Sequence, residues 1–240
     1  MSHFYVSPAY SHEGLNLFIE RYLMLQLHYF PVYWRAEPIR MLLNKAKVDF
    51  EDIHHTREEW PVVKKEGGFE FAQMPVLFIT DAATGVKKQY SQTCAILRYL
   101  GKQHGFYPAD IEEAWAVDSA LDATNDVVLA LGRIHYEADE ERRKQMTVDF
   151  VTGLLTTFLK AMNARLEQNA SHGPFLVGSG LTIADFFFGG LLVNVVFNEM
   201  NTAGAGMRPV FEQFAWVVKY RNAFQEEFAE YLAARPKRQH

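Results

Sequence analysis

The sequence is poor in cysteine, and its one thiol, Cys94, limits the chemistry that the chain can perform. A single cysteine forms no intramolecular disulfide and supplies no CxxC pair for zinc binding or dithiol redox reactions. This usage is typical of a reducing compartment. We therefore expect a cytoplasmic protein.

A long apolar run and a broad basic surface are also missing. The N-terminal segment MSHFYVSPAYSHEGLNLF has neither the basic start of a signal peptide nor the continuous apolar stretch of a membrane span. Lys and Arg number 24 against 29 Asp and Glu, a net charge of −5. The one basic cluster, RPKRQH at residues 235–240, we interpret as a solvated tail rather than a phosphate-binding patch. Neither nucleic acid nor a membrane is an expected partner.

What the chain does contain is enough apolar sequence for a sizeable core. Of its 240 residues, 49% are hydrophobic and 22% are charged, which is typical of globular proteins. That length suits one large domain or two smaller ones that share an interface. Residues 1–22 show no clear period, and we interpret them as an N-terminal extension.

Residues 23–103 predict a small α/β domain. YLMLQLHYF predicts a buried strand, and residues 36–46 predict a helix. FEDIHHT predicts a second strand, and MPVLFIT with GVKKQY predicts a hairpin around DAATG. An irregular segment lies between them, and a further helix begins near Gln92. Such a mixed order favours a single sheet covered by helices.

Residues 111–240 predict an all-helical domain, which residues 104–110 join to the first domain. One helical stripe has a period of three to four residues, and in SGLTIADFFFGG we expect Thr182 and Asp185 to form a capping box. Losing that box should cost about 1 kcal/mol of stability. The stripe consists of Phe150, Leu154, Leu155, Phe158, Leu159, Met162 and Leu166.

Several catalytic classes find no support in the sequence. His54 and His55 are adjacent, and the chain has no HExxH or CxxC motif. AGAGM at residues 203–207 lacks the GK[ST] ending of a phosphate loop, and no GxSxG motif occurs. We therefore expect no metal site.

The aromatic turn after the first strand has two interpretations. In YFPVYWR, the aromatic side chains either brace the junction of a strand with a helix, or Tyr29 presents its hydroxyl to a ligand. Pro75 in AQMPVL either blocks a sheet edge or forms a cis peptide that exposes the backbone of Met74. The helix opened by QTCAILRYLGK offers free N–H groups to an anion.

Taken in order, YFPVYWRAEPIRMLL, WPVVKKE, QMPVL, QTCAILRYLGK and LTIAD resemble the cytosolic glutathione S-transferases of the tyrosine type. The sigma class is nearest, with the mu and pi classes close, and the resemblance covers about residues 24–232. It implies a thioredoxin-like N-terminal domain, an all-α C-terminal domain and a homodimer. Reduced glutathione would be the co-substrate, and an apolar electrophile the second substrate, as in detoxification.

The resemblance also implies roles for individual residues. Tyr29 would donate a hydrogen bond to the glutathione sulfur, and Arg35 would supply positive charge. Stabilising a thiolate by about two pKa units from ~8.5 requires roughly 2.7 kcal/mol, within reach of such groups. The other glutathione-binding positions implied are Trp60, Lys64, Gln73, Met74, Pro75, Gln92, Thr93 and Asp126, the last reaching across the dimer, with Asp122 and Asn125 as near competitors.

Two departures concern the second substrate. Trp34 stands where these transferases commonly have Gly, and it either reshapes the electrophile pocket or packs under the extension. Arg133 stands where the sigma-type prostaglandin isomerase has tryptophan, so the resemblance does not imply prostaglandin isomerisation for this chain. We expect the pocket walls to include Phe30, Trp34, Arg133 and Tyr136.

Other roles stay open at this point. A structural ion pair with Glu37 or a neighbouring carboxylate is the alternative role for Arg35, and we interpret Cys94 as a buried structural thiol. The competing functions are a non-catalytic glutathione- or ligand-binding or crystallin-like member, and a glutathione-dependent isomerase or peroxidase.

Overall fold

A computed structural model describes residues 23–238, so the predictions made for residues 1–22 and 239–240 lie outside the described residues. Four strands form one mixed sheet in the order β2-β1-β3-β4. They are β1 (Leu23–Tyr29), β2 (Glu51–His54), β3 (Val76–Asp81) and β4 (Lys87–Ser91). β1 pairs in parallel with β2 and antiparallel with β3, and β3 and β4 form the predicted hairpin.

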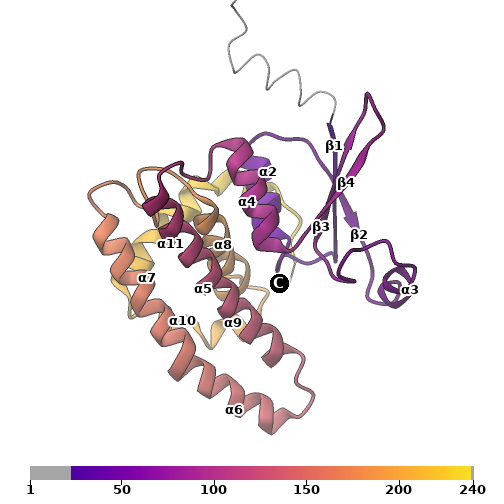
Figure 1. Cartoon of the computed structure of the whole chain (residues 1–240). Helices are drawn as coiled ribbons and strands as arrows, with labels where there is room; N and C mark the ends of the chain where they lie inside the picture. The colour runs from indigo at the N-terminus through magenta and orange to yellow at the C-terminus, as the bar shows by residue number, and fades with distance from the viewer. Residues whose placement is uncertain (1–22, 239–240) are drawn as a thin grey trace, which may run out of the picture.

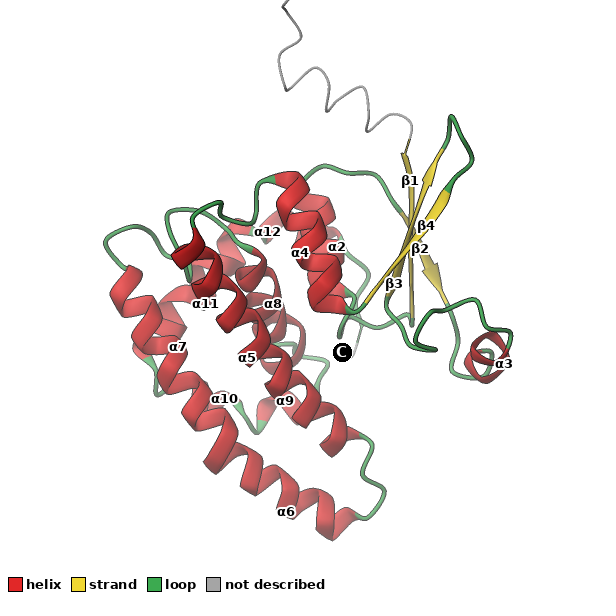
Figure 2. Cartoon of the chain, viewed as in Figure 1, coloured by secondary structure: helices red, strands yellow, loops and turns green. Residues whose placement is uncertain are grey.

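Helices α2 (Glu37–Lys45) and α4 (Thr93–His104) lie between the sheet and the helical domain, whereas α3 (Trp60–Lys65) lies on the far side of the sheet (Figures 1 and 2). α2 begins where predicted because Pro38 is favoured in a first turn, and Glu37 and Lys45 complement the helix dipole. Leu27 on β1 and Leu42 on α2 are both fully buried in the core between these layers.

The segment expected to be irregular contains α3. None of the six residues of this helix is buried. A helix without a buried face needs no apolar period in its sequence, so this pattern could not predict it.

The second half of the chain is helical throughout its regular structure. α8, at the centre, is buried along its whole length and packs against α5 and α2 (Figure 2). The helices are α5 (Ile111–His135), α6 (Glu140–Phe150), η1 (Val151–Leu155), α7 (Thr156–Asn169), α8 (Ile183–Leu191), η2 (Leu192–Val196), α9 (Thr202–Ala205), α10 (Arg208–Phe211), α11 (Ala215–Glu227) and α12 (Ala229–Ala234). With the mixed sheet, they confirm the predicted fold class of an α/β domain followed by an all-α domain.

The predicted apolar stripe is interrupted at one position. Leu154 is 42% exposed, whereas Leu155 and Phe158 are buried. The π-helical turn η1 occupies Val151–Leu155, and its wider turn changes the angle between successive side chains. A single uninterrupted α-helical period therefore overestimates the buried stripe by one residue.

The capping box is present at the start of α8, as predicted. The carboxylate of Asp185 accepts hydrogen bonds from the backbone N–H and the hydroxyl of Thr182, both at 2.8 Å, and from the N–H of Leu176 at 3.0 Å. Asp185 is completely buried, so water cannot replace its carboxylate as the acceptor for these donors.

Candidate functional site

Tyr29 is the last residue of β1, and its side chain is only 4% exposed. Burial raises the pKa of its hydroxyl to about 12, although the backbone N–H of Arg35 donates a hydrogen bond to it. The hydroxyl therefore keeps its proton at neutral pH and can donate a hydrogen bond to an anion. That is the protonation state a thiolate donor needs.

Arg35 is held between the two domains. Its guanidinium donates to Oδ1 of Asn125 on α5 at 3.2 Å, and its backbone carbonyl accepts from the hydroxyl of Thr93 at 3.3 Å. The alternative ion pair with Glu37 is not formed, because Glu37 is bonded to Arg40 and Arg235 instead. The charge of Arg35 is thus bound to a neutral partner and stays available beside Tyr29.

A cavity of about 960 Å³ opens beside Tyr29, with walls from both domains. Its size lies within the range of small-molecule sites. Leu129, Leu131, Ile134, Val195 and Met207 are among its apolar walls. The predicted site residues that line it are Tyr29, Phe30, Trp34, Arg35, Met74, Arg133 and Tyr136.

Other predicted glutathione positions lie near this cavity without lining it. Gln92 donates from Nε2 to Oε1 of Gln73 at 3.1 Å, which joins the start of α4 to the loop before β3. Thr93 is buried at that helix start, and Trp60 meets Phe30 edge to face at 6.0 Å between ring centroids. The peptide bond between Met74 and Pro75 is cis, which is one of the two structures predicted for AQMPVL.

Two predicted positions stand apart from these contacts. Lys64 is exposed on α3, and Asp126 is exposed on α5. Of the competitors for the role of Asp126, Asn125 bonds to Arg35, and Asp122 pairs with Arg98 at 2.8 Å. The geometry of one chain therefore leaves Asp126 as the least engaged of the three.

Trp34 forms part of the wall between the large cavity and a small crevice against α8. Its backbone φ is +30°, in the region that favours glycine. The sterics of this turn explain why a glycine suits the position, and the indole is accommodated because it packs against the core. Trp34 narrows the cavity but does not fill it.

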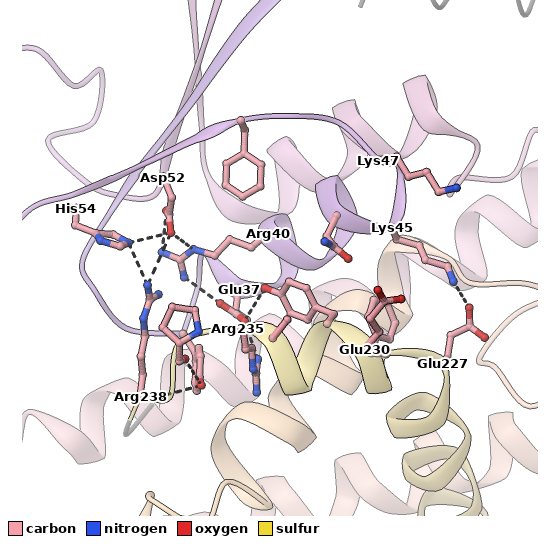
Figure 3. Close-up of a pocket in the computed structure, with 17 residues that line it drawn as sticks. Glu37, Arg40, Lys45, Lys47, Asp52, His54, Glu227, Glu230, Arg235 and Arg238 are labelled. Atoms are coloured by element: carbon pink, nitrogen blue, oxygen red, sulfur yellow. Dashed lines mark hydrogen bonds and ion pairs between the residues drawn. The ribbon is translucent and has the colours of Figure 1, made fainter.

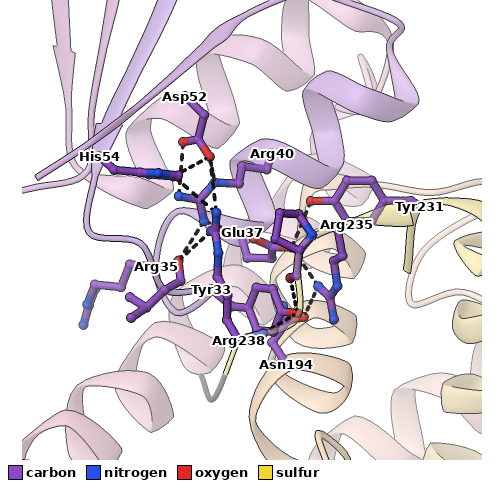
Figure 4. A network of polar contacts seen from close by, with 12 residues as sticks. Tyr33, Arg35, Glu37, Arg40, Asp52, His54, Asn194, Tyr231, Arg235 and Arg238 are labelled. Carbon is purple, nitrogen blue, oxygen red and sulfur yellow. Dashed lines mark hydrogen bonds and ion pairs between the residues drawn. The ribbon is translucent and has the colours of Figure 1, made fainter. Parts of the chain in front are cut away.

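Residues 235–238, here named the C-terminal strap, pack against the turn that carries Trp34 and Arg35. The hydroxyl of Tyr33 donates to the carbonyl of Pro236 at 2.8 Å and accepts from the N–H of Arg238 at 3.2 Å (Figure 4). The guanidinium of Arg235 lies 4.0 Å from the centre of the Tyr33 ring. The strap thus fixes the backbone directly before Trp34.

Ion pairs anchor the strap to the first domain. Glu37, only 1% exposed, accepts from Arg235 at 2.7 Å, from Arg40 at 3.1 Å and from the hydroxyl of Tyr231 at 2.9 Å. Asp52 accepts from Arg40 at 3.0 Å. These groups line one end of a second cavity of about 800 Å³ (Figure 3). The interpretation of RPKRQH as a solvated tail is therefore wrong for Arg235 and Arg238, because Arg235 pairs with the buried Glu37 on α2 and Arg238 pairs with the half-buried Asp52 on β2 at 3.9 Å.

Cys94 does not line the cavity. Burial raises the pKa of its thiol to about 11, so the thiol keeps its proton at neutral pH and is a poor nucleophile. This supports the structural interpretation of Cys94. Within residues 23–238, no group of three or more His, Cys, Asp or Glu side chains is placed to hold a metal ion, and no helix is long and apolar enough to span a membrane.

Comparisons with known proteins identify the family of the chain. A family model described as the C-terminal domain of glutathione S-transferases matches residues 125–235. A glutathione S-transferase of Anopheles gambiae is 32% identical over 70% of this chain and 77% of the relative, and glutathione S-transferase 2 of Manduca sexta is 34% identical over 68% and 75%. The chain therefore belongs to the glutathione S-transferase family, a family of enzymes.

The fold is shared with solved structures of the same family. A sigma class transferase of Fasciola hepatica superimposes with a TM-score of 0.77, covering 91% of this chain and 99% of that chain at 24% identity. At this identity the likeness concerns the fold.

Sequence reasoning missed three cationic residues of the cavity, namely Arg57, Arg143 and Lys144. Arg57 follows β2, whereas the other two lie in α6. Arg143 and Lys144 belong to the run EADEERRK, whose mixed charges are those of any exposed helix start. No local signal distinguishes them, because their relation to Tyr29 arises only when the domains pack together.

Proposed function

We propose that the protein joins the thiolate of reduced glutathione to an apolar electrophile. Tyr29 carries this proposal, because its buried, protonated hydroxyl lines a large cavity and Arg35 lies beside it. Tyr29 donates a hydrogen bond to the glutathione sulfur, and Arg35 stabilises the negative charge. The enzyme acts by proximity and electrostatic stabilisation, without a covalent intermediate on the protein.

The tripeptide is proposed to lie along the surface from α3 to α4. Trp60 and Lys64 receive its glycyl end, with the lysine paired to the carboxylate. The backbone of Met74 pairs with the cysteinyl portion. Gln73, Gln92 and Thr93 hold the γ-glutamyl carboxylate at the start of α4, where free N–H groups favour an anion.

We also propose a homodimer in which Asp126 reaches the γ-glutamyl ammonium of the neighbouring subunit. Its exposed place on α5 supports this role, and light scattering coupled to gel filtration tests the assembly. The division into residues 23–103, the linker 104–110 and residues 111–240 follows the order of sheet and helices, and a cytoplasmic location is part of the same proposal.

The competing non-catalytic function rests on a pocket closed by Trp34. The cavity of about 960 Å³ argues against closure by Trp34 and so removes the main ground for this alternative. Isomerisation or peroxide reduction would use the same thiolate.

Conjugation of glutathione to 1-chloro-2,4-dinitrobenzene by the wild type and Tyr29→Phe tests the proposal. We expect the variant to lower kcat/KM at neutral pH by about 10- to 100-fold, since losing up to two pKa units of thiolate stabilisation reduces the thiolate fraction by that range. Tyr99→Phe is the matched control, because burial also raises the pKa of Tyr99 to about 12 and its hydroxyl bonds Tyr90 and Gln103 away from the cavity. Equal rates for wild type and Tyr29→Phe would remove Tyr29 from the mechanism.

A further inference from the structure

We propose that the second substrate is an amphipathic electrophile with an acidic group, and that Arg57, Arg133 and Arg143, which line the cavity, hold that group. The inference rests on the proposed function of the cavity and names its substrate class. An apolar body would occupy the aliphatic walls, and the reacting carbon would face Tyr29.

The charge of the cavity is opposite to that of the protein. The chain carries a net charge of −5, yet among residues 23–238 no Asp or Glu lines this cavity. Arg35, Arg57, Arg133, Arg143 and Lys144 all line it. A cleft lined by cations and apolar side chains raises the local concentration of anions.

Not all of these cations are free to act on a ligand. Lys144 pairs with Glu140 at 3.2 Å and Glu141 at 2.9 Å, so its charge is largely offset. Arg143 donates only to the backbone carbonyl of Glu137, at 3.1 Å, and the carboxylate of Glu137 pairs with Arg142. The charge of Arg143 is therefore not neutralised by that contact.

Arg57 and Arg133 likewise have no carboxylate partner within the part of the chain that the structure describes. Both side chains are exposed at the cavity edge, where they can reach an entering ligand. Arg133 occupies the position for which the family resemblance predicts an electrophile contact.

Arg57 from the first domain and Arg143 from the second lie close to the same residue, His135. The guanidinium carbon of Arg57 lies 6.0 Å from the ring centre of Tyr136, at the end of α5. Arg57 and Arg143 both lie close enough to His135 to help burial lower its pKa. A carboxylate placed here would relieve the repulsion among these groups.

Tyr136 connects these cations with Tyr29. It lies near enough to Tyr29 to affect the pKa of that hydroxyl, and its own ring faces Arg57. A ligand that spans Tyr136 can therefore place one end at the sulfur and its acid group at the arginines. For an enone substrate, the sulfur forms a C–S bond to the β-carbon, the C=C π bond breaks, and the α-carbon takes a proton from solvent.

The test compares two electrophiles with the same reacting enone: ethacrynic acid, which carries a carboxylate, and its methyl ester, which is neutral. We expect the wild type to show a higher kcat/KM for the acid, and the acid-to-ester ratio to fall as salt is added. Arg57→Gln and Arg143→Gln should each lower that ratio by roughly fivefold, the scale of a solvent-exposed ion pair. Lys160→Gln, the same change of charge on an exposed position of α7 outside the cavity, should leave the ratio unchanged.

Two outcomes would overturn the inference. One is an acid-to-ester ratio that neither the arginine substitutions nor salt alters. The other is a rise in the KM for glutathione that is equal with both electrophiles, because the cations would then serve the tripeptide. If neither electrophile is conjugated, the proposed function fails, and calorimetry of acid and ester binding still decides the anion site.

Discussion

Arg235 donates to the carboxylate of Glu37 at 2.7 Å, although 198 residues separate the two in the sequence. The contact joins the C-terminal strap to the first residue of α2, directly after the turn that carries Trp34 and Arg35. The C-terminal end of the described chain therefore supports the geometry of the cavity from outside it.

Arg235→Ala should lower the free energy of unfolding by about 2 kcal/mol. Glu37 is almost fully buried and would lose one charged partner, while Arg40 and Tyr231 remain. Denaturant unfolding measures the change. Lys237→Ala is the control, because Lys237 is an exposed residue of the same strap; similar losses in both variants would contradict a specific role for the ion pair.

Replacement of Trp34 separates backbone strain from loss of the indole. Both Trp34→Gly and Trp34→Ala remove the indole, but only glycine adopts a positive φ without steric conflict. We expect the glycine variant to be more stable than the alanine variant by up to about 1 kcal/mol, the reverse of the usual order. Thermal and denaturant unfolding of the pair provide the measurement, and a more stable alanine variant would show that the turn relaxes.

Asp185→Ala should destabilise the fold by about 2–4 kcal/mol, more than the ~1 kcal/mol expected for an ordinary cap. Its completely buried carboxylate serves the N–H of Leu176 as well as both donors of Thr182. Asp139→Ala is the matched comparison, since Asp139 caps the exposed start of α6 through the N–H of Arg142. Equal losses in the two variants would show that burial adds nothing to the cap.

Acid should destabilise the protein partly through His28. Burial, followed by the neighbouring His55, lowers the pKa of His28 from 6.5 to about 4; Lys87 acts in the same direction and Glu51 opposes it. Between these pKa values the unfolded chain binds a proton that the native chain does not, so stability falls as pH decreases from about 6.5 to about 4.

His28→Phe should reduce the drop in Tm between pH 7.5 and 5.5, because phenylalanine suits the aromatic contacts with Phe69 and Phe78 and binds no proton. His172→Phe, at an exposed site, should retain the wild-type drop. An unchanged pH dependence in His28→Phe would assign the effect to other groups.

Local patterns predict most of the regular structure and part of the site. α2 follows from Pro38 and the charges at the helix ends, the hairpin from DAATG, and the cap of α8 from Thr182 and Asp185. The short helix α3 and the π-helical turn η1 were missed, because the first has no buried stripe and the second changes the period locally.

The sequence by itself determined that Tyr29 ends a buried strand, that Arg35 follows in a tight turn and that the chain divides into a sheet and a set of helices. These features depend on residue spacing and on hydrogen bonds between near neighbours. Only the tertiary structure decided that Arg57 and Arg143 meet at one cavity and that Arg235 returns to Glu37. Such relations depend on which charged side chains meet, and which are left without a partner, when distant segments pack. Spacing along the chain does not predict these contacts.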